Sequence, residues 1–185
     1  MNSKCTQEMT SFIVMDVLER AHELERQGSH IIHLEVGEPD FDTPEHIKEA
    51  ARVAIAAGKT KYTAVDGTPG LKQAVIDKFR RDNGFEFTPE QVLVSCGGKQ
   101  SFFNLAQALL NPGDEVIIPT PYWVSYPEMV GLLGGRPRII PTDASTGFKI
   151  TPDMLRRAIT PKSSAIILNT PSNPSGMLYS REELV

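Results

Sequence analysis

The chain has 185 residues, of which 40% are hydrophobic and 23% charged, the ordinary balance of a globular protein that can bury one substantial core. Its formal net charge of -4 provides no basic surface, so nucleic acid is not expected as a partner. No apolar stretch approaches the roughly 20 residues that cross a bilayer, and the N-terminus lacks the order of a signal peptide, so we expect a cytoplasmic protein without a membrane partner.

The first half of the chain predicts helices joined by turn-rich loops. Three stretches carry apolar residues at helical spacing, and each precedes a glycine that can end a helix: residues 11–27, 43–57 and 71–83. Between the first two lies HIIHLEVG (30–37), which predicts a short strand that runs into a loop.

The second half alternates strands and helices regularly. Strands are predicted at 91–96, 115–119, 136–141 and 164–169, and helical stretches at 99–110, 122–135, 151–159 and 180–185. Apolar strands that do not alternate with polar residues, separated by helices, indicate a mostly parallel sheet covered on both faces. We therefore predict an α/β fold with three α/β/α layers, preceded by an N-terminal helical segment. Ligands of such sheets bind where strands end and helices begin.

Three loops fall at such positions. SCGGKQS (95–101) places two glycines before a helix, which suits either a phosphate cradle made by backbone N–H groups or a plain tight turn. A nucleotide P-loop is excluded, because Leu93 stands where that motif needs glycine and Gln100 where it needs serine or threonine.

The other two loops each present one distinctive side chain. Trp123, the only tryptophan, follows a predicted strand and could be either a core aromatic residue or a flat face for a ligand ring. In NTPSNPSG (169–176) two prolines flank Asn173, which could either form a local Asx-turn or hold its amide ready to donate to a ligand oxygen.

Four motifs in order give the chain a resemblance to a known family. EVGEPDFDTP, YTAVDGTPGLKQAV, NPGDEVIIPTPYWVSYPEMV and NTPSNPSG resemble the class I aminotransferases of the pyridoxal-phosphate fold-type I superfamily, nearest to the branch that contains many aspartate aminotransferases. The resemblance runs from about residue 30 to the last residue. One departure is NPSG where the family has NPTG, and Ser175 keeps the hydroxyl group.

The resemblance implies a cofactor, pyridoxal 5'-phosphate, and the residues that would hold it. Gly98, Lys99 and Gln100 would bind the phosphate through backbone N–H groups, Trp123 would stack on the pyridine ring, and Asn173 would donate to the phenolic oxygen. In the same way Tyr62 would reach the phosphate of a neighbouring subunit in a homodimer, and Gly37 would lie against the substrate carboxylate. The substrates would be an amino acid and a 2-oxo acid.

The family's catalytic lysine has no counterpart in this sequence. That lysine forms the Schiff base with the cofactor, and in family order it lies beyond the NPTG loop together with an aspartate and an arginine. None of the lysines present stands in a Ser-x-x-Lys setting. We therefore expect the chain to be the N-terminal portion of an aminotransferase of roughly twice this length and to be inactive by itself.

The resemblance also divides the chain. Residues 1–42 would belong to the small domain or arm, and residues 43–185 to an incomplete large cofactor-binding domain. Two other functions stay open: a non-catalytic sensor domain with an aminotransferase-like fold, and another fold-type I enzyme such as a lyase or decarboxylase. The retained loops bind the cofactor and do not choose the reaction.

No metal site is predicted. His30 and His33 would point to opposite faces of a strand, and Cys5 and Cys96 match no metal-binding or redox spacing.

Overall fold

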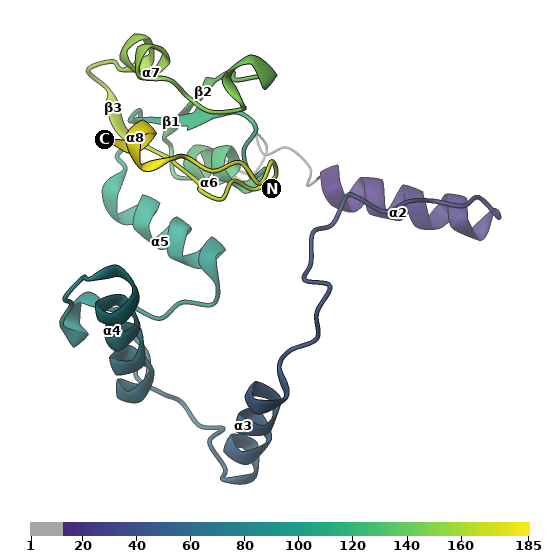
Figure 1. Ribbon diagram of the computed structural model, residues 1–185, viewed down its shortest axis with the longest axis vertical. Coiled ribbons are helices and arrows are strands. Elements are labelled where there is room, and N and C mark those ends of the chain that lie inside the picture. The colour runs from purple at the N-terminus through teal and green to yellow at the C-terminus, as the bar shows by residue number, and fades with distance from the viewer. Residues whose placement is uncertain (1–12) are drawn as a thin grey trace, which may run out of the picture. The chain divides into compact units, whose positions relative to one another are not determined.

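The computed structural model describes residues 13–185, and Figure 1 traces its helices and strands. Its chain contacts divide it into two compact units. One unit comprises residues 17–98, and the other contains residues 99–185 together with residues 13–16. Cys5 and the first two residues of the helix predicted over 11–27 lie outside the described residues. The predicted domain boundary after residue 42 stays a prediction.

A three-stranded parallel sheet organises the unit of residues 99–185. Its strands are β1 (Glu115–Pro119), β2 (Arg136–Ile140) and β3 (Ser163–Ile166), in the order β2-β1-β3. The pairs β1/β2 and β1/β3 are both parallel, so a helix-containing connection must return the chain between strands. The predicted α/β class with a parallel sheet is confirmed.

The central strand β1 is buried on both faces, which explains its apolar sequence EVIIP. Val116 and Ile118 pack against Val130 on one face, while Ile117 packs on the other face in a cluster that contains Ile140 and Ala158. Successive side chains of a strand point to opposite faces, so an unbroken apolar run supplies two cores at once.

Helices cover each of these two cores. Phe102 of α5 (Gly98–Leu109) joins the first cluster, and α6 (Ser125–Leu132) supplies its Val130. On the opposite face α7 (Pro152–Ala158) supplies Ala158 to the second cluster. The remaining elements of this unit are the 3-10 turn η2 (Ala144–Thr146) and α8 (Arg181–Leu184). The three layers predicted from the sequence are therefore present in this unit.

The unit of residues 17–98 is helical. It contains most of α2 (Ile13–Arg26), α3 (Glu45–Ala56), α4 (Pro69–Asn83) and the 3-10 turn η1 (Pro89–Gln91). The start of α4 follows from local chemistry, because the Thr68 hydroxyl accepts a hydrogen bond from the Leu71 N–H at 3.4 Å and proline occupies the first helical position. Among the described helices none is both long and apolar enough to cross a bilayer.

Two strand predictions are wrong. Residues 30–37 and 91–96 contain no strand, and within the second stretch the Val94 N–H donates to the Asp66 carbonyl at 3.0 Å. In the first stretch Ile32 and Leu34 are 76% and 88% exposed. An apolar run becomes a strand only when another strand supplies hydrogen-bond partners, and none of the described residues does so for these two stretches.

The buried central strand generates a stability prediction. We expect Ile118→Ala, at a fully buried position, to lower the free energy of unfolding by about 2–5 kcal/mol, since it removes apolar contacts and leaves a cavity. Ile139→Ala is the matched control, because Ile139 is 38% exposed and its truncation should lower the free energy of unfolding by less. The fluorescence of the only tryptophan, Trp123, in a urea titration reports this unit. Equal losses in the two variants would contradict the assignment of the core.

The apolar side chains on α3 generate a second prediction. No residue of α3 is buried, and Ile47, Val53 and Ile55 are all at least half exposed, so we expect the chain expressed alone to associate. The double variant Ile47→Lys with Val53→Lys should reduce this association in sedimentation velocity measurements. The control Ala51→Lys, also exposed on α3, should not. A sharp, reversible melt of a monomeric wild-type chain would oppose the prediction.

Candidate functional site

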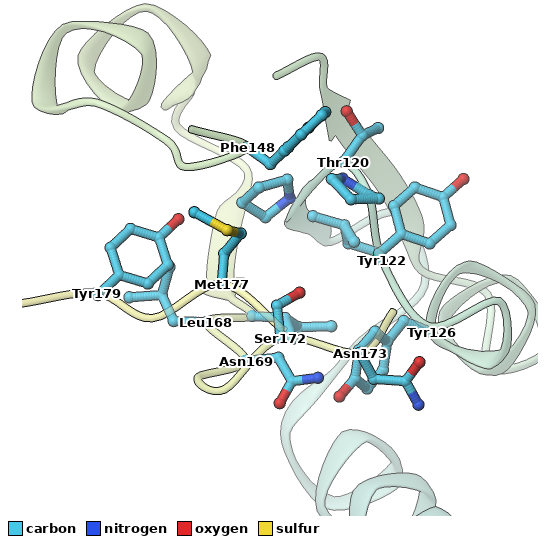
Figure 2. Close-up of a pocket in the computed structure, with 14 residues that line it drawn as sticks. Thr120, Tyr122, Tyr126, Phe148, Leu168, Asn169, Ser172, Asn173, Met177 and Tyr179 are labelled. Atoms are coloured by element: carbon cyan, nitrogen blue, oxygen red, sulfur yellow. The ribbon is translucent and has the colours of Figure 1, made fainter. Parts of the chain in front are cut away.

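A small cavity lies at the carboxyl end of the parallel strands, where α/β sheets bind their ligands (Figure 2). Its volume is ≈ 20 Å³, room for about one water molecule. One wall comes from the end of β1 and the segment that follows, another from the loop after β3, and Phe148, which follows η2, completes the lining. The lining residues are Ile118, Pro119, Thr120, Pro121, Tyr122, Tyr126, Phe148, Ile167, Leu168, Asn169, Ser172, Asn173, Met177 and Tyr179.

The loop that carries Asn173 is fixed by its own hydrogen bonds. The Gly176 N–H donates to the Ser172 carbonyl at 2.7 Å, and the Ser172 N–H donates to the Met177 carbonyl at 2.9 Å. With its amide oriented so that both of its groups are satisfied, Asn169 accepts from the Asn173 N–H at 3.0 Å. The backbone on both sides of the Asn173 carboxamide is therefore held before any ligand arrives.

Trp123 lies beside the cavity through its contact with Tyr126. The two rings meet edge to face with centroids 5.3 Å apart, and Tyr126 itself lines the cavity with Asn173. The ammonium group of Lys99 lies 5.0 Å from the centroid of the Trp123 ring. Lys99, Trp123, Tyr126 and Asn173 thus form one continuous group within a single unit.

The electrostatics of this group favour an anion beside an aromatic ring. Lys99 stands in the first turn of α5, where the helix dipole adds partial positive charge. Gly97, directly before that helix, has φ of +85°, a conformation that a side chain would strain. Burial raises the pKa of the Tyr126 hydroxyl, so this phenol stays protonated near neutral pH.

A second set of contacts holds the far wall of the cavity. The Tyr179 hydroxyl accepts a hydrogen bond from the Ile150 N–H at 2.9 Å, and Lys149 pairs with Glu183 at 2.5 Å. The hydrogen bond from Lys149 is the largest cause that lowers the pKa of the Glu183 carboxyl, so this carboxylate stays ionised at neutral pH. These two contacts join the residues directly after Phe148 to the segment that contains Tyr179 and Glu183.

The predicted site residues fall into two groups. Gly98, Lys99 and Gln100 open α5 as expected, and the structure brings Lys99, Trp123 and the cavity lined by Asn173 together. Gly37 and the fully exposed Tyr62 belong to the unit of residues 17–98. The role of each residue stays a prediction.

The sequence analysis missed Tyr122, Tyr126 and Asn169. Both tyrosines line the cavity, and Asn169 positions the backbone of Asn173. A signal for the tyrosines was present, because YWVSY packs three aromatic residues directly behind a strand end. Which of them faces the cavity depends on how α6 packs, and the sequence alone does not give that.

Comparison with known proteins identifies the class of this chain. The profile of the aminotransferase class I and II family matches residues 29–185, so the chain belongs to that family. Within it, the chain falls in the aspartate aminotransferase branch. It is 58% identical over 168 residues to the aspartate/prephenate aminotransferase of Nitrosomonas europaea, a match that spans 91% of this chain and 42% of that protein.

Further relatives agree, and all of them are longer. Identity to the aspartate/prephenate aminotransferase of Thermus thermophilus is 52% over 182 residues, covering 98% of this chain and 47% of the relative. The crystal structure of the aspartate aminotransferase from Rhizobium meliloti superposes with a TM-score of 0.94 at 47% identity, over 99% of this chain and 46% of that one. The structure of the aspartate aminotransferase from Thermus thermophilus with maleate superposes with a TM-score of 0.93 at 51% identity, over 100% of this chain and 48% of that one. The chain therefore spans less than half the length of these relatives.

Proposed function

We propose that the protein containing this chain is a pyridoxal-phosphate-dependent aminotransferase that moves an amino group between an amino acid and a 2-oxo acid. The observation that supports this most directly is the continuous group of Lys99, Trp123, Tyr126 and Asn173 at the carboxyl end of the sheet, in a chain of this family. Two of the relatives are named aspartate/prephenate aminotransferases, which makes aspartate and prephenate the first substrates to test.

The residues present fit the cofactor. Its phosphate suits the N-terminus of α5 with the Lys99 ammonium nearby, and its ring suits the indole face of Trp123. When bound, pyridoxal phosphate supplies an electron sink for bonds at the substrate's α-carbon.

On this proposal the chain's own residues bind and orient. Backbone N–H groups of Gly98, Lys99 and Gln100 hold the phosphate, and Trp123 fixes the plane of the ring. The Asn173 carboxamide donates to the phenolic oxygen. Because hydrogen bonds already hold the backbone of its loop, binding costs little further conformational entropy there.

Two residues of the other unit complete the proposed set. Gly37 lies against the substrate carboxylate, where a missing side chain permits close approach. Tyr62 reaches the phosphate bound by a second copy in a homodimer, a role that its full exposure in this chain permits.

A substitution at Asn173 tests the proposal. In the protein that contains this chain, we expect Asn173→Asp to lower kcat/KM for aspartate about tenfold or more. A hydrogen bond to a charged group is worth about 1.5–3 kcal/mol, and the carboxylate replaces the donor with an acceptor of the same shape. Steady-state assays with aspartate and 2-oxo acids measure the effect.

The matched control is Asn111→Asp. Asn111 is exposed in a turn of the same unit, away from the cavity lining, and the same change there should leave kcat/KM within about twofold. Wild-type protein that binds the cofactor but transfers no amino group would reject the function, and equal effects at both positions would reject the role of Asn173.

The lysines of this chain generate a separate prediction. None stands three residues after a serine, and Lys99 is engaged at the Trp123 face, so we propose that no lysine here is the one that bonds the cofactor covalently. Borohydride treatment of the 185-residue chain with pyridoxal phosphate, followed by peptide mapping, should yield only scattered substoichiometric labelling. One lysine labelled stoichiometrically would refute this.

A further inference from the structure

Three side chains of the other unit meet at a place that the proposed function does not use. His22, Glu25 and His33 each offer a ligand atom, and these atoms all lie within 4.8 Å of one another. The Nε2 atom of His33 lies 2.9 Å from the Glu25 carboxylate, and the His22 and His33 ring centroids are 5.7 Å apart. All three residues belong to the unit of residues 17–98.

Local structure explains why the three residues meet. His22 and Glu25 are three residues apart on α2, so they share one face of the helix. The helix ends at Arg26, and in the turn that follows Gly28 has φ of +91° and its N–H donates to the Glu25 carbonyl at 2.8 Å. The chain then runs back along α2, which brings His33 to the face that carries His22 and Glu25 (Figure 1).

We propose that His22, Glu25 and His33 form a binding site for a divalent cation of the zinc type. Two imidazoles and one carboxylate are the protein ligands of many zinc sites that leave a fourth position to water. The same set would disfavour Mg²⁺ and Ca²⁺, which prefer oxygen ligands throughout.

Glu35 supports the assignment as an outer partner. The Nδ1 atom of His33 lies 2.6 Å from the Glu35 carboxylate, which also accepts the Leu34 N–H at 2.9 Å. A metal-ligating histidine typically donates its other ring N–H to a carboxylate, which fixes the ring and leaves the opposite nitrogen to face the metal. The Glu35 side chain is only 10% exposed, so little of it faces solvent.

The neighbouring cation does not oppose a metal. Arg26, the residue after Glu25, pairs with Glu23 at 2.7 Å, and Gln27 donates to the same carboxylate at 2.6 Å. The side chains of His33 and Glu25 are 36% and 41% exposed, so an ion has access from solvent.

Only small movements are needed to bind the ion. Two ligand atoms at about 2.1 Å from a tetrahedral zinc ion lie roughly 3.4 Å apart. The His33–Glu25 pair, now at hydrogen-bond distance, would open by about half an ångström, and the widest separation in the cluster would close.

The ion would join α2 to a segment that has no regular structure. Residues 30–36 contain no helix or strand, so a bond from His33 to the helix would restrict a segment that leads to Gly37. Sequence patterns do not predict this cluster, because residues 30–37 read as a strand and His22 is remote from His33 along the chain. The proposal does not depend on the proposed aminotransferase function.

The first experiment titrates the cofactor-free chain, treated with a chelator and carrying Cys5→Ser and Cys96→Ser to remove thiol ligands, with ZnCl₂ by isothermal calorimetry. We expect one equivalent to bind with micromolar affinity. Titration with CoCl₂, followed by proton NMR, should broaden the ring signals of His22 and His33 and leave those of His30 and His46. This measurement needs no ligand variant and does not rely on a variant that folds.

Variants then assign the ligands. His33→Ala and His22→Ala should each weaken zinc binding at least tenfold, and Glu35→Gln should weaken it about 10-fold to 100-fold, as loss of an outer partner does. The matched controls are His30→Ala and His46→Ala, which remove exposed histidines outside the cluster and should leave the affinity unchanged. Circular dichroism checks that each variant folds.

Three results would overturn the proposal. The first is a wild-type dissociation constant for zinc above about 100 μM. The second is equal broadening of the ring signals of all four histidines. The third is a loss of zinc affinity in His30→Ala or His46→Ala as large as the loss in His33→Ala. Because the titrations contain no pyridoxal phosphate and measure no transamination, failure here leaves the proposed function standing, and the reverse also holds.

Discussion

Burial of β1 on both faces is the constraint on which the unit of residues 99–185 depends. A strand with apolar side chains on both faces is stable only when neighbouring strands pair with its edges and helices cover both sides. Here β2 and β3 pair with it in parallel, and α6 and α7 supply the buried Val130 and Ala158 on opposite faces. Everything that positions the cavity follows from that arrangement.

Parallel pairing decides where chemistry can occur. The carboxyl ends of β1 and β3 lie at one edge of the sheet, so the segment with Tyr122 and Trp123 and the loop with Asn173 leave the sheet on the same side. Backbone N–H groups at the start of α5 add a centre of positive potential, with Lys99 at the Trp123 ring. An anionic aromatic cofactor is the kind of ligand that such a group can orient.

The two units contrast in how their segments are held. Residues 99–185 contain eight of the ten buried apolar side chains among the described residues, whereas α3 has none and residues 30–36 are largely exposed. Polar contacts carry more of the local order in residues 17–98, such as the buried Lys72 with Asp66 and the pair of carboxylates around His33. The cluster around His33 is likewise held by polar contacts.

By itself, the sequence determined the parallel α/β class, the described helices within a few residues and the three loops of the candidate site. Hydrophobic periodicity, helix-capping residues and the glycines that end helices are all local signals. It also carried the family resemblance. Tertiary structure alone decided that residues 30–37 and 91–96 are not strands, that Tyr126 links Trp123 to the cavity, and that His22 meets His33. Each of these depends on a partner remote along the chain, and no local pattern specifies which partner a segment finds.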